Sequence, residues 1–260
     1  MISISVVCPT YNSVNFVERT LETVLSQSRL PEEIIISDDG SSDGTPEVVE
    51  RYLARNGASV TWRIVRNTHR GPGATRNSGI SQATGDWVAF LDSDDLWEPT
   101  KLERMEIEIG EAQTANFFCH DEQRIKKNGN VSPLVYGRRY RSSSPLTPQL
   151  YFANMFSTSA VICRRDLLTR HLGFNESLMS AQDYELWLRL SPSIKPVFVH
   201  EVLGKYVERE GNITSGKLVK RMYNEFRIAW MHRGLVSPLR LFARLSRIIL
   251  SYIKQYIIAL

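Results

Sequence analysis

Three carboxylates, Asp92, Asp94 and Asp95, stand within four positions, directly after the apolar run from Trp87 to Leu91. A short apolar run without polar alternation is typical of a strand buried on both faces, so the acids should lie where that strand leaves the sheet. Negative charges this close repel one another unless a cation neutralises them, and carboxylate oxygens beside phosphate favour Mg²⁺ or Mn²⁺. The acids therefore form either a candidate metal site or a solvated turn that caps the next helix.

The elements that must position these acids alternate between strand and helix. Strands are expected at residues 3–8, 34–36, 60–65 and 87–91, with helices beginning near Asn12, Pro46 and Gly71. This order predicts right-handed crossovers and a mainly parallel sheet, whose ligands bind beyond the carboxyl ends of the strands. The loops at that edge carry an aromatic residue, several acids and two arginines: Tyr11, Asp38, Asp39, Arg70, Arg76, Asp92 and Asp94.

The second half of the chain has a less regular pattern. A helix is expected over residues 99–115, followed by an irregular stretch to about residue 145. Further strands are expected at 159–163, 197–199 and 202–207, and further helices at 164–171 and 182–190.

The composition is that of a globular protein, because 42% of the 260 residues are hydrophobic and 23% are charged. Three well-separated cysteines lack metal-binding spacing and favour a reducing compartment. Neither a secretory signal nor a membrane-spanning stretch is recognised, so we expect a cytoplasmic protein.

Four motifs, in order within residues 3 to about 105, resemble those of the family 2 glycosyltransferases, which are inverting enzymes with a GT-A fold. The motifs are Ser5–Asn12, Ile36–Thr45, Gly71–Gly79 and the Asp92-Ser93-Asp94 form of the DXD motif. The resemblance implies an α/β fold with a Rossmann-like, mainly parallel central sheet flanked by helices, and a C-terminal helical extension. We expect a catalytic domain over residues 1–215, with a nucleotide-binding half (1–105) and an acceptor half (106–215), before a tail at 216–260.

In similar enzymes, the positions of Pro9, Tyr11 and Asp39 hold the nucleotide base. Tyr11 offers a face for stacking, and Asp39 can accept a base N–H, which favours uracil. Arg76 lies in the segment that closes over the nucleotide, with pairing to Asp38 or Asp39 as the alternative.

The same resemblance assigns the diphosphate end of the site. Asp92 is expected to face the ribose or the sugar, and Asp94 to bind the Mn²⁺ or Mg²⁺ that bridges the diphosphate, with Asp95 in support. Arg209 stands in a loop where similar proteins often carry histidine, and its permanent charge suits a clamp on the diphosphate.

Asp183 is the candidate catalytic base. The stretch Met179–Trp187 resembles the family's Glu-Asp motif, whose second acid takes the proton of the acceptor hydroxyl, although Gln182 replaces the first acid. Glu185 is the reserve candidate. An acid that merely complements a helix N-terminus is the alternative.

The tail is strongly basic, with nine Lys and Arg against one acid, Glu225, in residues 217–260 of a chain whose net charge is +4. From Pro238 the polar residues recur every three or four positions: Arg240, Arg244, Arg247, Ser251, Lys254 and Gln255. This pattern predicts that residues 238–260 form a helix on an anionic membrane, or one that packs on the catalytic domain or in a homodimer. No nucleic-acid reader motif accompanies the charge, so no nucleic-acid partner is expected.

The sequence thus predicts a metal-dependent, inverting transferase that moves a sugar from a UDP-sugar to a saccharide or lipid-linked saccharide acceptor. It would act in surface-polysaccharide or glycan assembly, peripherally at the cytoplasmic face of a membrane. A sugar-1-phosphate nucleotidyltransferase and a catalytically inactive carbohydrate- or partner-binding module are the alternatives.

Overall fold

The computed structural model describes residues 2–209 and 218–258, with the backbone alone at positions 218, 220, 221, 254 and 256–258. The part of the Arg209 loop at residues 210–214 lies outside the described residues. The first half alternates strand and helix as the sequence predicts. Its elements are β1 (Ile4–Thr10), α1 (Val17–Leu25), β2 (Glu33–Asp38), α2 (Thr45–Asn56), β3 (Thr61–Arg66), α3 (Pro72–Gln82) and β4 (Trp87–Phe90).

The second half begins with short elements and ends in two long helices. Its elements are β5 (Leu96–Trp97), α4 (Lys101–Glu111), β6 (Phe117–Ile125), β7 (Val131–Leu134), α5 (Leu146–Phe152), the 3-10 turn η1 (Thr158–Ala160), β8 (Val161–Arg164), α6 (Arg165–Arg170), α7 (Gln182–Leu190), β9 (Pro196–Val207), α8 (Leu218–Met231), the 3-10 turn η3 (Arg233–Leu235) and α9 (Pro238–Ile258).

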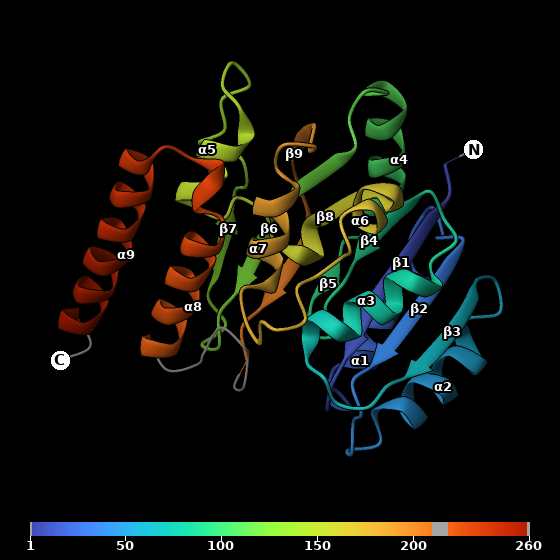
Figure 1. Cartoon of the computed structure of the whole chain (residues 1–260). Helices are drawn as coiled ribbons and strands as arrows, with labels where there is room; N and C mark the ends of the chain where they lie inside the picture. The colour runs from blue at the N-terminus through green and yellow to red at the C-terminus, as the bar shows by residue number, and fades with distance from the viewer. Residues whose placement is uncertain (1, 210–217, 259–260) are drawn as a thin grey trace.

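The strands form one mixed sheet in the order β3-β2-β1-β4-β8-β6-β9-β5, and β7 pairs with β6 (Figure 1). The first four strands are parallel, as predicted. Because β8 is antiparallel to both β4 and β6, and β9 is parallel to β6, the carboxyl ends of β6 and β9 lie at the same edge as those of β1 and β4. This direction brings Arg209, two residues beyond β9, to the edge that carries the acidic turn.

Helices cover both faces of the sheet because its central strands are apolar on both sides. On β1, Val6 and Cys8 pack in the core beneath α1, α2 and α4, whereas Val7 packs in the core beneath α3 and α7. Gly79 of α3 lies so close to β1 that an added Cβ would stand 2.6 Å from a methyl group of Val7. Each buried aliphatic side chain of these two cores contributes about 1.5–3 kcal/mol to folding.

The region expected to be irregular, residues 116–145, contains the hairpin of β6 and β7. This part of the prediction is wrong because β6 buries three consecutive polar residues, His120, Asp121 and Glu122, which interrupt an apolar strand pattern. Tyr136 Oη donates to Glu122 Oε2 at 2.7 Å, so one oxygen of this interior carboxylate is hydrogen-bonded. The two short strands expected at 197–207 are one strand, β9, whose pairing with β6 shifts register around Asp121.

The tail packs on the rest of the chain through one face of each helix. Figure 1 shows α8 and α9 side by side at the end of the molecule farthest from β3. Ile248 and Tyr252 of α9 belong to the same core as α7. Arg244 does not lie on an exposed polar stripe, as its spacing suggested. It is buried, because its guanidinium donates to the carbonyl of Phe152 and to Glu225 Oε2 at 2.8 and 2.9 Å.

Candidate active site

A cleft of about 370 Å³ opens at the carboxyl ends of β1, β2, β4 and β9. Seven residues singled out from the sequence line it: Pro9, Tyr11, Asp39, Arg76, Asp92, Asp94 and Arg209. Sequence reasoning missed other lining residues, among them His69, Met179 and Tyr206. Residues more than 190 positions apart thus meet at one edge of the sheet.

At one end of the cleft an aromatic pair lies beside a fixed carboxylate. The rings of Tyr11 and His69 stack with centroids 4.5 Å apart and an interplanar angle of 23°. His69 Nδ1 lies 2.9 Å from Asp39 Oδ2, while the backbone N–H groups of Arg70 and Gly71 donate to the same carboxylate at 2.9 and 3.0 Å. These donors hold the buried Asp39 as an acceptor in one orientation, with Tyr11 half exposed beside it.

At the other end each of two acids is paired with an arginine. Arg76 binds Asp92, and Arg209 binds Asp94 through Nε. The Arg209 guanidinium also lies over the Phe16 ring, 4.3 Å from its centroid, in a cation–π contact. Arg76 therefore takes Asp92 as its partner, rather than the Asp38 or Asp39 weighed from the sequence.

Burial, followed by the nearby charge of Asp92, raises the pKa of Asp94, and Arg209 opposes both effects. The backbone of the turn is held from α1, because Thr20 Oγ1 donates to the carbonyl of Ser93 at 2.9 Å. The Ser93 hydroxyl lies 2.7 Å from that of Ser13. The two cleft-facing carboxylates are thus presented on a rigid turn.

The donor set of this turn fits a divalent ion only together with a substrate. Among the residues that the structure describes, no group of three or more His, Cys, Asp or Glu side chains could hold a metal ion. Mg²⁺ is commonly bound through one or two carboxylates completed by phosphate oxygens, and the cleft-facing Asp92 and Asp94 match that requirement.

Asp183 lies in the first turn of α7, which follows the left-handed residue Ala181 (φ 56°). It does not line the cleft itself, but the charges of Arg76 and Asp92 are near enough to affect its titration. Burial is the main cause that raises the pKa of Asp183, and its Oδ2 accepts a hydrogen bond from Asn154 Nδ2 at 3.3 Å.

The reserve candidate, Glu185, lies in a different environment. Its side chain is 1% exposed and is bound by Arg189 and His232, so it has no free path to an acceptor hydroxyl. Asp183 therefore stays the candidate base.

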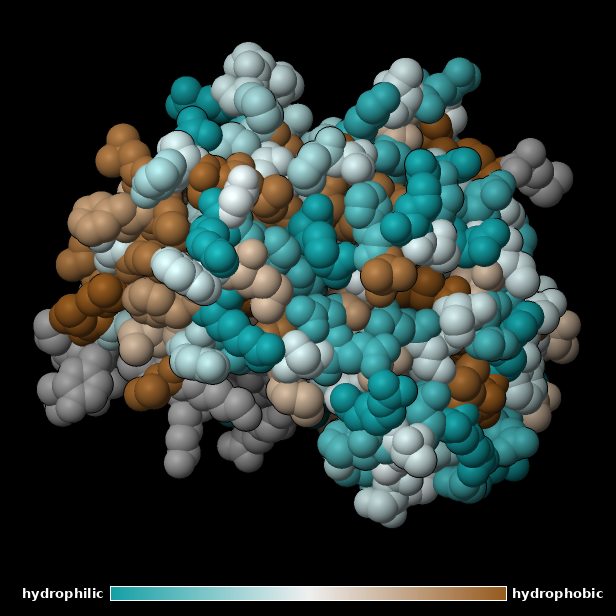
Figure 2. All heavy atoms as spheres, viewed as in Figure 1, coloured by the Kyte–Doolittle hydropathy of each residue, from teal (hydrophilic) through white to brown (hydrophobic). Residues whose placement is uncertain are grey.

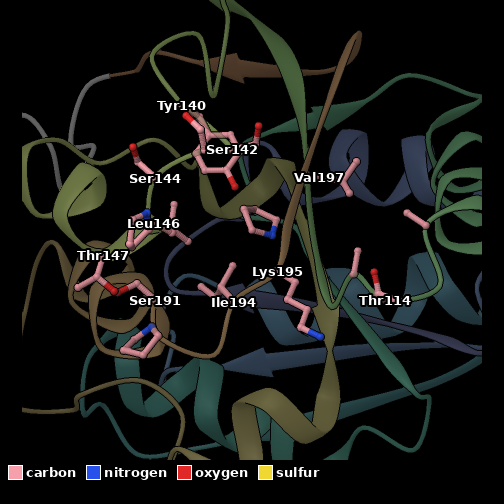
Figure 3. Close-up of a pocket in the computed structure, with 16 residues that line it drawn as sticks. Thr114, Tyr140, Ser142, Ser144, Leu146, Thr147, Ser191, Ile194, Lys195 and Val197 are labelled. Atoms are coloured by element: carbon pink, nitrogen blue, oxygen red, sulfur yellow. The ribbon is translucent and has the colours of Figure 1, made fainter.

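Another hollow, of about 560 Å³, lies elsewhere. Figure 3 shows Tyr140 and Ser144 on one side of it and Thr114 on the other. Its lining includes residues from just before β6 and from the start of β9, so it lies at the sheet edge opposite the acidic turn. No acid lines this hollow, and it is not a candidate for the chemistry.

Comparison with known proteins finds relatives by sequence. A curated relative, the GalNAc(5)-diNAcBac-PP-undecaprenol beta-1,3-glucosyltransferase of Campylobacter jejuni, is 28% identical over 217 residues, which are 83% of this chain and 68% of the relative. Several other curated relatives are longer, and the chain spans only 22–32% of their length.

Two examples represent the solved structures that share the fold. One is that of Staphylococcus aureus TarS 1-349 with UDP-GlcNAc, with a TM-score of 0.75, 21% identity and coverage of 95% of this chain and 72% of that one. The other is a mannosyltransferase from Pyrobaculum calidifontis with GDP-Man and Mn²⁺, with a TM-score of 0.69, 19% identity and coverage of 94% and 68%. At these identities the likeness establishes the GT-A fold alone. The model of the family "Glycosyl transferase family 2" matches residues 5–168, and the chain is an inverting glycosyltransferase that belongs to this family.

Proposed function

We propose that the chain moves a sugar from a UDP-sugar to a saccharide or lipid-linked saccharide acceptor, with Mn²⁺ or Mg²⁺, in the assembly of cell-surface polysaccharide or glycan. The observation that carries the proposal is the layout of one cleft. It has an aromatic pair with a fixed acid at one end and two acids with two arginines at the other. In this proposal residues 1–105 bind the nucleotide and residues 106–215 the acceptor, within a catalytic domain at 1–215 that precedes the tail at 216–260.

Pro9, Tyr11 and Asp39 would hold the base. Tyr11 is 47% exposed, so its ring offers a free face on which a base can stack. Asp39 accepts and never donates while ionised, so it selects a base with an N–H at its edge, as uracil has. His69 both stacks on Tyr11 and contacts Asp39, and it would move or rotate as the base enters.

Asp94, with Asp92 beside it facing the ribose or sugar, would hold the divalent ion. When bound, that ion supplies positive charge against the charge that grows on the leaving diphosphate. Arg209 and Arg76 carry permanent charges at the same end of the cleft. Each guanidinium group can bind two phosphate oxygens at once.

Asp183 would take the proton from the acceptor hydroxyl as that hydroxyl attacks the anomeric carbon. Its raised pKa suits this role, because a base works best when its pKa approaches the working pH. Attack on one side of the sugar while the diphosphate leaves on the other inverts the anomeric centre in a single displacement.

A screen of nucleotide-sugars for Mn²⁺-dependent release of nucleoside diphosphate tests the proposal. Release from a UDP-sugar is expected, and Asp94→Ala and Asp183→Ala should each abolish it. Asp166→Ala is the matched control, because Asp166 is an exposed acid on α6 that pairs with Arg170, four residues away on the same helix. If the wild type binds UDP but releases none from any donor, the chain is a binding module and the proposal fails.

We further propose that α9 attaches the protein peripherally to an anionic membrane at its cytoplasmic face. None of the described helices is long and apolar enough to cross a bilayer. Among the side chains of α9 that the structure describes, five large apolar ones are exposed nevertheless: Leu239, Phe242, Ile249, Leu250 and Ile253. Apolar residues gather over α9 at the left of Figure 2.

Charge favours a bilayer over a second protein copy as the occupant of this surface. Arg240 and Arg247 are exposed on the same helix, and basic side chains beside an apolar face favour anionic lipid headgroups. Deleting the tail would also remove Ile248 and Tyr252 from the core, so point substitutions make the cleaner test.

The variant Leu250→Asn/Ile253→Asn should lose flotation with anionic vesicles, while Val131→Asn, an exposed apolar position on β7, should keep it. Vesicles of neutral lipid should bind the wild type more weakly. Equal flotation of all variants would refute membrane attachment through α9, and a concentration-dependent dimer lost in the double variant would assign the surface to a homodimer.

A further inference from the structure

Asp95, the third acid of the turn, faces away from the cleft. It is buried and does not line the cavity, whereas Asp92 and Asp94 do. The N–H of Asp95 donates to the carbonyl of Asp92 at 3.0 Å, which closes a tight turn. This closure sends two carboxylates outward and the third inward.

Both oxygens of Asp95 have partners in the interior. The hydroxyl of Ser159 donates to Oδ2 at 2.6 Å, and the backbone N–H of Val207 donates to Oδ1 at 3.1 Å. A metal ligand needs a lone pair aimed at the ion, and this carboxylate directs its oxygens at η1 and the end of β9.

Ser159 joins both ends of the acidic turn. Its hydroxyl accepts from the N–H of Asp92 at 3.1 Å while it donates to Asp95. Its carbonyl accepts from Trp97 Nε1 at 3.0 Å and from Lys101 Nζ at 2.9 Å. Ser159 is 1% exposed, so these bonds are shielded from water and hold η1 firmly against the turn.

Val207 lies only two residues before Arg209, whose guanidinium pairs with Asp94. β5 pairs antiparallel with β9 at Leu96 and Lys205, which brings the end of β9 beside the turn. The bond from Val207 to Asp95 then fixes where the chain departs toward Arg209. One buried carboxylate thus connects the turn that carries Asp94 to the strand that carries Arg209.

We propose that Asp95 and Ser159 are positioning residues that hold Asp94 and Arg209 at a fixed spacing, so that both reach the same diphosphate, and that Asp95 is not a metal ligand. The proposal deepens the proposed function and rests on it. It replaces the expectation that Asp95 supports the ion.

Measurements of metal binding distinguish an acid that binds the ion from an acid that only positions the turn. In Mn²⁺ titrations with saturating UDP, followed by electron paramagnetic resonance, Asp95→Asn should keep the wild-type affinity within about twofold. Asp94→Asn should weaken it by at least about tenfold. The asparagine is isosteric and can still accept from Val207 and bond to Ser159. A loss in Asp95→Asn equal to that in Asp94→Asn would overturn the proposal.

Nucleotide binding without metal tests the positioning of Arg209. Ser159→Ala and Arg209→Ala should each weaken UDP binding by about tenfold. The affinity for uridine should stay unchanged, because only the diphosphate reaches Arg209. The double variant Ser159→Ala/Arg209→Ala should be no weaker than Arg209→Ala alone. Ser159→Thr, which keeps the hydroxyl, should restore UDP binding.

The positioning role of Ser159 would be refuted if the two substitutions weakened UDP binding additively in the double variant. It would also be refuted if Ser159→Ala weakened uridine binding as much as UDP binding. Failure of the proposed function itself looks different, because the wild type would then either bind no UDP or bind UDP and release none from any donor.

Discussion

Two acids on α7, two positions apart, should separate catalysis from stability. Asp183 is near enough to Arg76 and Asp92 at the cleft for their charges to affect it, whereas Glu185 is sealed against α8 and η3 by its partners Arg189 and His232. We therefore expect Asp183→Asn to stop turnover with the fold intact, and Glu185→Ala to weaken the fold with the chemistry intact.

For Asp183→Asn, kcat should fall by about 10²–10⁴, the usual contribution of a positioned general base. This fall corresponds to roughly 3–5 kcal/mol, at about 1.4 kcal/mol per tenfold. Because burial raises the pKa of Asp183, its ionised form is less stable in the folded protein than in the unfolded chain. The neutral asparagine should therefore leave Tm unchanged or raise it.

For Glu185→Ala, the lost contacts are the bonds from Arg189 Nε and Nη2 at 3.0 and 3.1 Å and the contact with His232 Nε2 at 2.8 Å. Removing one partner of a buried pair costs about 3–5 kcal/mol. Arg189 keeps the carbonyls of His171 and Gly173 as acceptors, and its side chain is 27% exposed. The loss of folding free energy should therefore lie near the lower end of this range. At about 2–4 °C per kcal/mol, Tm should fall by about 6–12 °C.

The assay combines calorimetric Tm with kcat and KM for diphosphate release, measured well below both melting transitions. Glu185→Gln, which keeps an acceptor for Arg189, should lie between Glu185→Ala and the wild type in Tm. Full turnover in Asp183→Asn, or loss of turnover in folded Glu185→Ala, would refute the assignment of roles.

Four further outcomes are expected. Since burial raises the pKa of Asp183 above 3.8, kcat/KM should fall as pH drops through that raised value, and a pH profile without this acid limb would contradict the role. Removing divalent ions with EDTA should abolish release, and Arg209→Ala should bind Mn²⁺ more tightly than the wild type when no nucleotide is present, because Asp94 then loses its competing cation. Gly79→Ala should lower the free energy of unfolding by about 1–3 kcal/mol in a denaturant titration, since its Cβ would collide with Val7; unchanged stability would mean that α3 can shift.

The first half of the fold was predictable because β1, β2 and β4 contain apolar runs bounded by turn residues. The hairpin of β6 and β7 was not, because His120 and Glu122 are buried in the interior of β6, among partners distant in sequence. The prediction that Arg244 lies on an exposed polar stripe was wrong for a related reason. Its helical spacing indicates a polar face, but only the fold shows that Glu225 of α8 lies on the buried side of α9 and accepts a hydrogen bond from Arg244.

The cleft was predictable where family motifs follow a strand directly, as at Tyr11, Asp39 and Asp94. His69 was missed because a single histidine in a loop carries no spacing signal, and its contact with Asp39 spans 30 positions. Ser159 was missed for the same reason, since a serine before a strand shows nothing of its four hydrogen bonds.

If the proposed function holds, the pairing of Asp92 and of Asp94 with an arginine implies that metal and diphosphate bind together. Without ligands, Arg209 neutralises Asp94 and Arg76 neutralises Asp92, so either ligand alone must break an ion pair and leave one member uncompensated. When both arrive, the acids exchange an arginine for the metal ion and the arginines exchange an acid for phosphate, so that no charge is left unpaired. By linkage, each ligand must then strengthen the other's binding by the same factor. Under the proposed function, we therefore expect the cleft to bind the metal–nucleotide complex in preference to a free nucleotide or a free ion.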